Sequence, residues 1–149
     1  MSKTKELTMN ITSPRVGAAS TNRFNVGLWI IQILLALAFG LAGVMKLTQP
    51  IAELARNLGW PGVVPLALVR FIGAAEFAAA IGLVAAAATR IRPSLTPLAA
   101  VGLVLVMISA FLFHSVRGEM KALPLNLILG TMAAFVAWGR SKKVPISGR

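Results

Sequence analysis

Four long apolar segments follow one another along the chain. The first has no charged residue between Arg23 and Lys46, and the third and fourth have none at all. A membrane-spanning helix needs roughly 20 residues, whereas the helices of a soluble bundle would carry polar stripes that these runs lack. The pattern predicts an all-α fold, a four-transmembrane-helix bundle, with helices over residues 26–47, 64–88, 94–115 and 123–138.

The loop after the first segment has a helical pattern of its own. Its sequence, TQPIAELARNLGWPG, places apolar residues at Ile51, Leu54, Ala55 and Leu58, which is the spacing of one helix face. Pro50 suits a helix start, and Gly59 suits a helix end. We expect a short amphipathic helix lying in the membrane interface between helices 1 and 2, with Trp60 as an anchor.

The polar segments at the two ends divide the chain into three parts. Residues 1–24 have no apolar stripe and are expected to form a disordered cytoplasmic tail. Residues 25–140 are expected to form the membrane domain, and residues 141–149 a basic cytoplasmic tail.

Charge and composition narrow the class of protein. Charged residues make up 13% of the chain, about half the usual fraction of roughly 25%, as expected where the surface meets a lipid bilayer. The net charge of +11 does not indicate nucleic acid, because the charges lie in short segments between apolar runs. With no cysteine and one histidine, disulfides, thiol chemistry and an autonomous metal site are not expected.

The basic residues predict how the chain crosses the membrane. They favour one side of the predicted bundle, which is the cytoplasmic side by the positive-inside rule. The sequence therefore predicts a multi-pass protein of the inner (cell) membrane with cytoplasmic N- and C-termini. Ten basic residues lie on this side (Lys3, Lys5, Arg15, Arg23, Arg90, Arg92, Arg140, Lys142, Lys143, Arg149) and four on the other (Lys46, Arg56, Arg117, Lys121).

The stretch VRFIGAAEF, residues 69–77, carries two charges inside an apolar segment. At 1.5 Å per residue, Glu76 lies near the middle of the bilayer and Arg70 nearer the outer side. Charges in a membrane are costly and often functional. We therefore take the polar groups of the outer half as pocket candidates: Lys46, Arg70, Glu76, His114 and Asn126, with Arg117 and Glu119 as outer-loop candidates.

Each candidate also has a simpler interpretation. Lys46 and His114 could be interfacial residues, and Arg70 could reach back to the headgroups. Glu76 could form a purely structural ion pair, for which Lys46 is a plausible partner because a lysine side chain can reach some way along its helix. Asn126 could join two helices by a hydrogen bond, and Arg117 with Glu119 could be a solvated loop pair.

The ordered motifs FGLAGVMKL, NLGWPG and RFIGAAEFAAAIGL resemble the DoxX-like family of small four-helix integral membrane proteins. The resemblance extends over about residues 26–140 and includes His114, Gly118 and Glu119. It implies a neighbourhood of quinone-linked redox chemistry or thiol homeostasis, because relatives include the small subunit of an archaeal thiosulfate:quinone oxidoreductase. It does not assign an activity, so whether the chain is an enzyme stays open.

Two functional hypotheses and a structural one follow. The chain could be a membrane subunit or anchor of a redox complex, with an oxidoreductase partner subunit and a quinone as the candidate cofactor. It could instead bind, transport or isomerise a small lipophilic molecule in an intramembrane polar pocket. The charges could also serve only to pair the helices, and a homo-oligomer stays open. No cofactor is evident from the sequence itself.

Overall fold

The computed structural model describes residues 16–148 and has no strand in that range. Five α-helices and two short helical turns make up this part of the chain, which confirms the all-α prediction. The elements are α1 (Val16–Thr48), α2 (Ile51–Leu58), the 3-10 turn η1 (Trp60–Val63), α3 (Leu66–Thr89), α4 (Leu95–Val116), α5 (Leu123–Trp138) and the π-helical turn η2 (Gly139–Lys143).

Two boundaries differ from the sequence-based expectation. Helix α1 begins at Val16, so residues 16–24 belong to it and not to a disordered tail. Within this N-terminal part of α1, the ring of Phe24 packs edge-on against Phe135 of α5, with 5.7 Å between centroids. At the other end η2 continues beyond α5, so the tail expected from residue 141 begins inside a helical turn. Residues 1–15 of the expected N-terminal tail lie outside the described residues.

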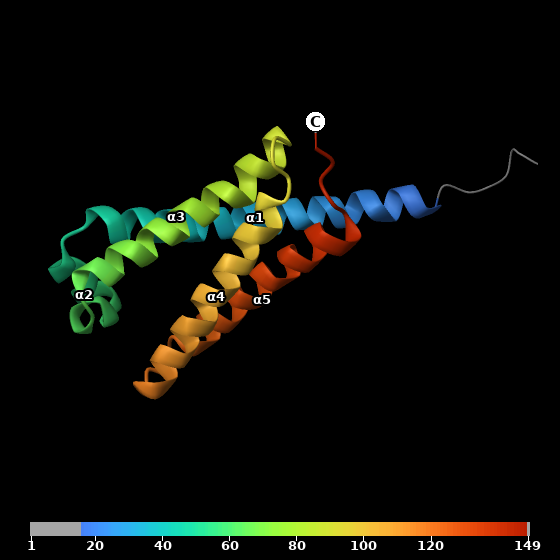
Figure 1. The fold of residues 1–149 in the computed structure, drawn as a ribbon. Coiled ribbons are helices and arrows are strands. Elements are labelled where there is room, and N and C mark those ends of the chain that lie inside the picture. Colours follow the sequence, from blue (N-terminus) through green and yellow to red (C-terminus); the bar gives the residue numbers. More distant parts are fainter. Residues whose placement is uncertain (1–15, 149) are drawn as a thin grey trace, which may run out of the picture.

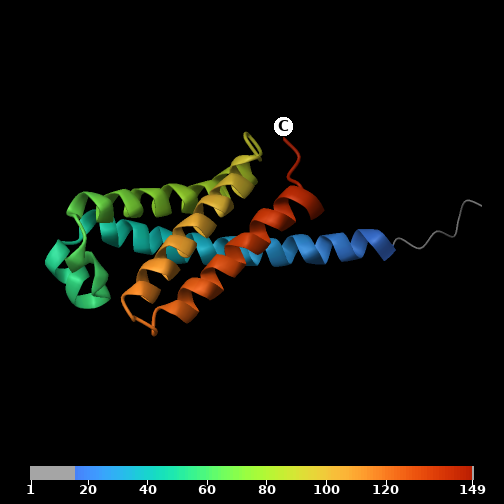
Figure 2. The same cartoon turned by 60° about the horizontal axis from the view of Figure 1, so that its bottom comes forward.

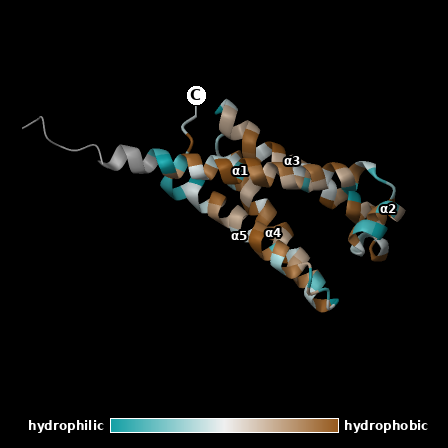
Figure 3. Ribbon diagram, turned by 180° about the vertical axis from the view of Figure 1, so that it is seen from behind, coloured by the Kyte–Doolittle hydropathy of each residue, from teal (hydrophilic) through white to brown (hydrophobic). Residues whose placement is uncertain are grey.

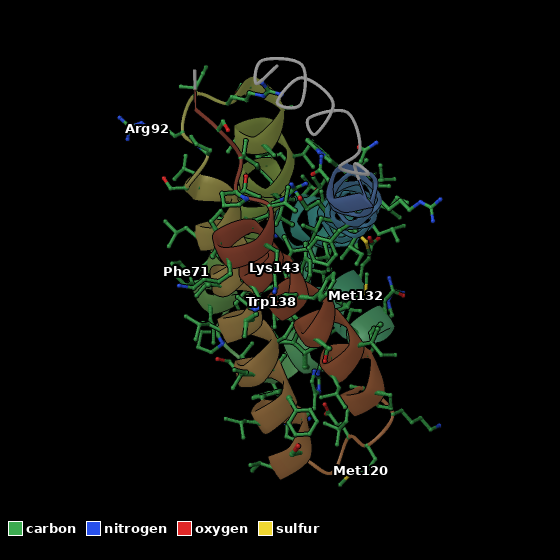
Figure 4. The ribbon with its side chains drawn as sticks, turned by 90° about the vertical axis from the view of Figure 1, so that its right-hand side faces the viewer. Phe71, Arg92, Met120, Met132, Trp138 and Lys143 are labelled. Atoms are coloured by element: carbon green, nitrogen blue, oxygen red, sulfur yellow. The ribbon has the colours of Figure 1, made fainter. Side chains whose placement is uncertain are left out.

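The helices form two hairpins that diverge. Helix α3 runs back along α1, and α5 runs back along α4 (Figure 1). The hairpins lie close together near the α3–α4 turn and separate toward the end where α2 lies, as the turned view also shows (Figure 2). Arg92, in the α3–α4 turn, and Met120, in the α4–α5 loop, mark opposite ends of the bundle (Figure 4). We call these the terminal end and the α2 end.

Within the described residues, four helices are long and apolar enough to cross a membrane: Asn22–Thr48, Leu66–Thr89, Leu95–Val116 and Leu123–Lys143. Their middle parts are hydrophobic, and hydrophilic residues gather toward the two ends and on α2 (Figure 3). Large apolar side chains such as Leu41 and Phe71 point outward and are mostly exposed. A lipid bilayer is the solvent that such a surface requires, so the chain is a multi-pass membrane protein.

Glycines bring α1 and α3 into close contact. A methyl group added at Gly43 would lie 2.7 Å from the carbonyl oxygen of Gly73, and one added at Gly73 would lie 2.7 Å from Cβ of Lys46. Only glycine fits this approach, as at other packed membrane helix faces. The contact presses Lys46 against the face of α3 that carries Glu76.

Candidate functional site

A cavity of about 360 Å³ lies at the α2 end, where the two hairpins diverge. All four spanning helices contribute to its wall, and Leu58 and Trp60 contribute from the α2–η1 segment. Trp60, which we expect to be an interfacial anchor, also lines this cavity and packs against Phe113, with 6.5 Å between ring centroids. The wall is apolar except for four side chains, which we call the cavity cluster: Lys46, Glu76, His114 and Asn126.

Lys46 and Glu76 form a buried ion pair across the α1–α3 contact. Lys46 Nζ lies 2.6 Å from Glu76 Oε2. The two residues are only 7% and 4% exposed, respectively. Lys46 is the partner that the sequence suggested for Glu76, and the close approach at Gly43 and Gly73 explains why the side chains meet. The pair is charge-balanced, which lowers the cost of burying each charge.

Arg70 lies outside the cavity wall and forms hydrogen bonds at the C-terminal end of α1. Its guanidinium donates hydrogen bonds to the backbone carbonyl oxygens of Lys46 and Gln49, the latter at 2.9 Å. The last carbonyls of a helix lack partners within the helix, and a nearby cation is favourable there. Arg70 therefore caps α1, while the other four pocket candidates share the cavity.

His114 belongs to a polar network that leads from the cavity to the α4–α5 loop. Its Nδ1 lies 2.5 Å from Glu119 Oε2, and Arg117 Nε donates to Glu119 Oε1 at 2.7 Å. The hydrogen bond from Arg117 is the largest cause, and the one from His114 the next, of a pKa of the Glu119 carboxyl below its usual value. The expected loop pair of Arg117 and Glu119 thus exists, and it also holds the His114 ring. Gly118, at φ +71°, makes the tight turn between them.

Asn126 has unused hydrogen-bonding capacity. It lies in the second turn of α5 and lines the cavity. Its buried Nδ2 has no hydrogen-bond partner within the described part of the chain. Buried polar atoms are normally paired, so this amide is the polar group of the wall that most needs a partner.

The sequence did not reveal a second buried polar cluster, at the terminal end. Arg140 was expected among the cytoplasmic basic residues, yet it is only 3% exposed. It donates to Gln32 Oε1 and to Asn25 Oδ1, both at 2.6 Å, and its guanidinium lies 5.5 Å from the Trp29 ring centroid. Gln32 in turn donates to the carbonyl oxygen of Leu83 at 2.6 Å. We call Asn25, Gln32 and Arg140 the terminal cluster.

Among residues 16–148, no group of His, Asp or Glu side chains is arranged to hold a metal ion. Fold and site together define a small four-helix integral membrane protein with a polar cavity between its hairpins. The chain belongs to the DoxX-like family, whose profile matches residues 30–136. No match is found among curated proteins or among solved structures.

Proposed function

We propose that this protein binds a small lipophilic molecule, by its polar head group, in the cavity between the two hairpins. The observation that carries the proposal is the composition of the wall, in which a few polar groups converge in an apolar surround. Ligand sites of this kind typically have volumes of about 300–1,000 Å³ and a few polar groups that orient the ligand. The volume of about 360 Å³ suits one ring-sized head group with part of its tail.

The charge distribution supports an orientation for this site. Basic residues concentrate at the terminal end, where Arg90, Arg92, Lys142 and Lys143 lie, and this end faces the cytoplasm in our proposal. The cavity then lies in the outer half of the inner membrane. A lipophile dissolved in the bilayer could enter between the hairpins without crossing water.

A quinone belongs to the class of molecules that this wall suits. The ammonium of Lys46 and the amide of Asn126 are donors of the kind that quinone oxygens accept. In that case the chain would serve as the membrane subunit of a redox complex. The family resemblance is compatible with this role, because it implies a neighbourhood of quinone-linked redox chemistry or thiol homeostasis. The oxidoreductase partner would supply the electron-carrying groups, because this sequence has no cysteine and no evident haem or flavin signature.

Native mass spectrometry of the detergent-purified protein tests the proposal. The informative variant is Ala110→Leu, which fills part of the cavity from the α4 wall. Ala134→Leu adds the same atoms on an exposed face of α5 and is the matched control. We expect wild type and Ala134→Leu to retain a small lipophile that Ala110→Leu lacks. Equal retention by all three proteins, or none by wild type after mild extraction, would contradict the proposal.

A further inference from the structure

The two walls of the cavity differ in the hydrogen-bonding capacity that they leave unused. On the α1–α3 wall, Lys46 and Glu76 bind each other. On the α4–α5 wall, His114 and Asn126 both line the cavity. Asn126 Nδ2 has no partner in the described part of the chain, and the contact of His114 with Glu119 uses Nδ1, not Nε2. A ligand head group would therefore gain most from the α4–α5 wall, because a bond there breaks no existing pair.

The network around His114 determines what this ring can offer. The Glu119 carboxyl has a lowered pKa because Arg117 and His114 hydrogen-bond to it, so it is ionised at neutral pH and can only accept. The hydrogen in the 2.5 Å contact must then belong to Nδ1 of His114. A neutral imidazole that donates from Nδ1 has a bare Nε2, which can only accept a hydrogen bond. In the neutral form of the ring, the form that our inference assigns to His114, the free nitrogen of this wall is thus an acceptor.

Asn126 offers the complementary group. Its Nδ2 needs an acceptor, and a side-chain amide can present its NH2 group by turning about its last bond. The α4–α5 wall therefore combines one acceptor, on His114, with one donor, on Asn126. A hydroxyl group is the smallest head group that donates one hydrogen bond and accepts another.

We infer that the cavity selects lipophiles with a hydroxyl head group, such as a phenol or quinol, whose O–H donates to His114 Nε2 and whose oxygen accepts from Asn126. Arg117 and Glu119 act as positioning residues that hold the imidazole in the accepting tautomer. This inference rests on the proposed function and narrows its ligand class. An ether or a carbonyl head group would leave His114 Nε2 without a hydrogen bond, because neither carries a proton to donate. Among the quinones of the proposed function, the inference therefore favours the reduced quinol form over the oxidised quinone.

Two matched probes test this inference: 4-nonylphenol and its methyl ether, 4-nonylanisole. They share a ring and tail and differ in the donating hydrogen. Fluorescence of Trp60, in a Trp29→Phe/Trp138→Phe background, reports binding because Trp60 lines the cavity. The same titration is repeated on this protein with the further substitution Ala110→Leu, which fills part of the cavity. Its signal gives the background that is due to partition of the probe into the micelle.

We expect wild type to bind the phenol roughly tenfold more tightly than the ether, the value of one hydrogen bond. The preference should disappear in His114→Leu and shrink in Asn126→Leu. Asn25→Leu, the same substitution outside the cavity, should keep it. The comparison of the two probes on wild type stands even if a variant does not fold.

Each contrary outcome has its own meaning. Equal or tighter binding of the ether would overturn the hydroxyl inference and leave the proposed lipophile site intact. Signals no larger than those of Ala110→Leu for both probes would overturn the proposed function as well. A preference for the phenol that persists in His114→Leu would remove His114 from the binding role.

Discussion

The cavity cluster and the terminal cluster both bury polar groups within the bundle, yet their surroundings differ. Lys46 and Glu76 balance each other's charge and stand in the wall of a cavity. Arg140 has no carboxylate partner among the described residues, and its hydrogen bonds go to amide oxygens of Asn25 and Gln32. The terminal cluster also lies away from the cavity. Burial alone therefore does not identify a functional group.

Each cluster keeps one buried polar atom without a partner among the described residues, Arg140 Nη2 and Asn126 Nδ2. The difference between the clusters lies in the open space beside them, which only the cavity cluster has. In the terminal cluster, side chains of α1 surround the guanidinium of Arg140, and Gln32 extends the network to α3. This arrangement ties the end of α5 to two other helices. In the cavity cluster, Asn126 and His114 line a cavity that has room for a ligand. We therefore expect substitutions in the terminal cluster to change stability alone. Substitutions in the cavity cluster should change binding, and they should also lower stability where they break the Lys46–Glu76 pair.

The largest expected effect is the loss of one member of the buried pair. Glu76→Leu leaves the Lys46 ammonium buried without its partner, which typically costs about 3–5 kcal/mol of stability. The double variant Lys46→Met/Glu76→Leu removes both charges and should recover most of that loss. Unfolding in mixed micelles titrated with SDS gives the free energies of unfolding.

The double variant also separates stability from function. It should fold but lose part of its affinity for polar lipophiles, because half of the cavity cluster is gone. If the double variant were as unstable as Glu76→Leu, the pair would contribute to stability as a specific contact. The contrast between the two clusters would then fail.

Much of the fold could be predicted from the sequence because it depends on local pattern. The apolar runs predicted the four spanning helices, and the spacing in IAELARNL predicted α2 at the bounds Ile51–Leu58. The pairing of Lys46 with Glu76 was also accessible, since both residues lie on interior faces of neighbouring helices. These features follow from the periods of helices and the cost of charges in lipid.

The remaining features depend on long-range packing. Arg140 is buried by Asn25 and Gln32, more than a hundred residues earlier, and no local pattern reports such a contact. The cavity depends on how far the two hairpins diverge, which is a property of the assembled bundle (Figure 1). For the same reason the sequence grouped Arg70 with the pocket, although it caps the end of α1 instead.

A smaller effect is expected at the terminal cluster. Gln32→Leu removes the acceptor for Arg140 Nε, and losing a hydrogen bond to a buried charged group costs about 1.5–3 kcal/mol. Affinity for 4-nonylphenol should stay unchanged, because Gln32 does not line the cavity. Micelle unfolding and the Trp60 titration measure the two quantities on one preparation. Weaker binding of 4-nonylphenol by Gln32→Leu at unchanged stability would show that the terminal cluster affects ligand binding at the cavity.

The smallest expected effect is a pH dependence at Glu119. Its pKa is lowered in the folded protein, from an ordinary value of 4.5, by hydrogen bonds from Arg117 and His114. The folded state therefore holds the carboxylate more readily than the unfolded chain does, so this stabilisation is complete above the ordinary pKa. It is lost as the pH falls below that value and through the lowered pKa.

Glu119→Gln should flatten this acid-side decrease in melting temperature, whereas Glu53→Gln, on exposed α2, should leave it unchanged. An identical acid profile for wild type and Glu119→Gln would mean that Glu119 does not hold the His114 ring in solution, and the accepting role assigned to His114 would lose its basis.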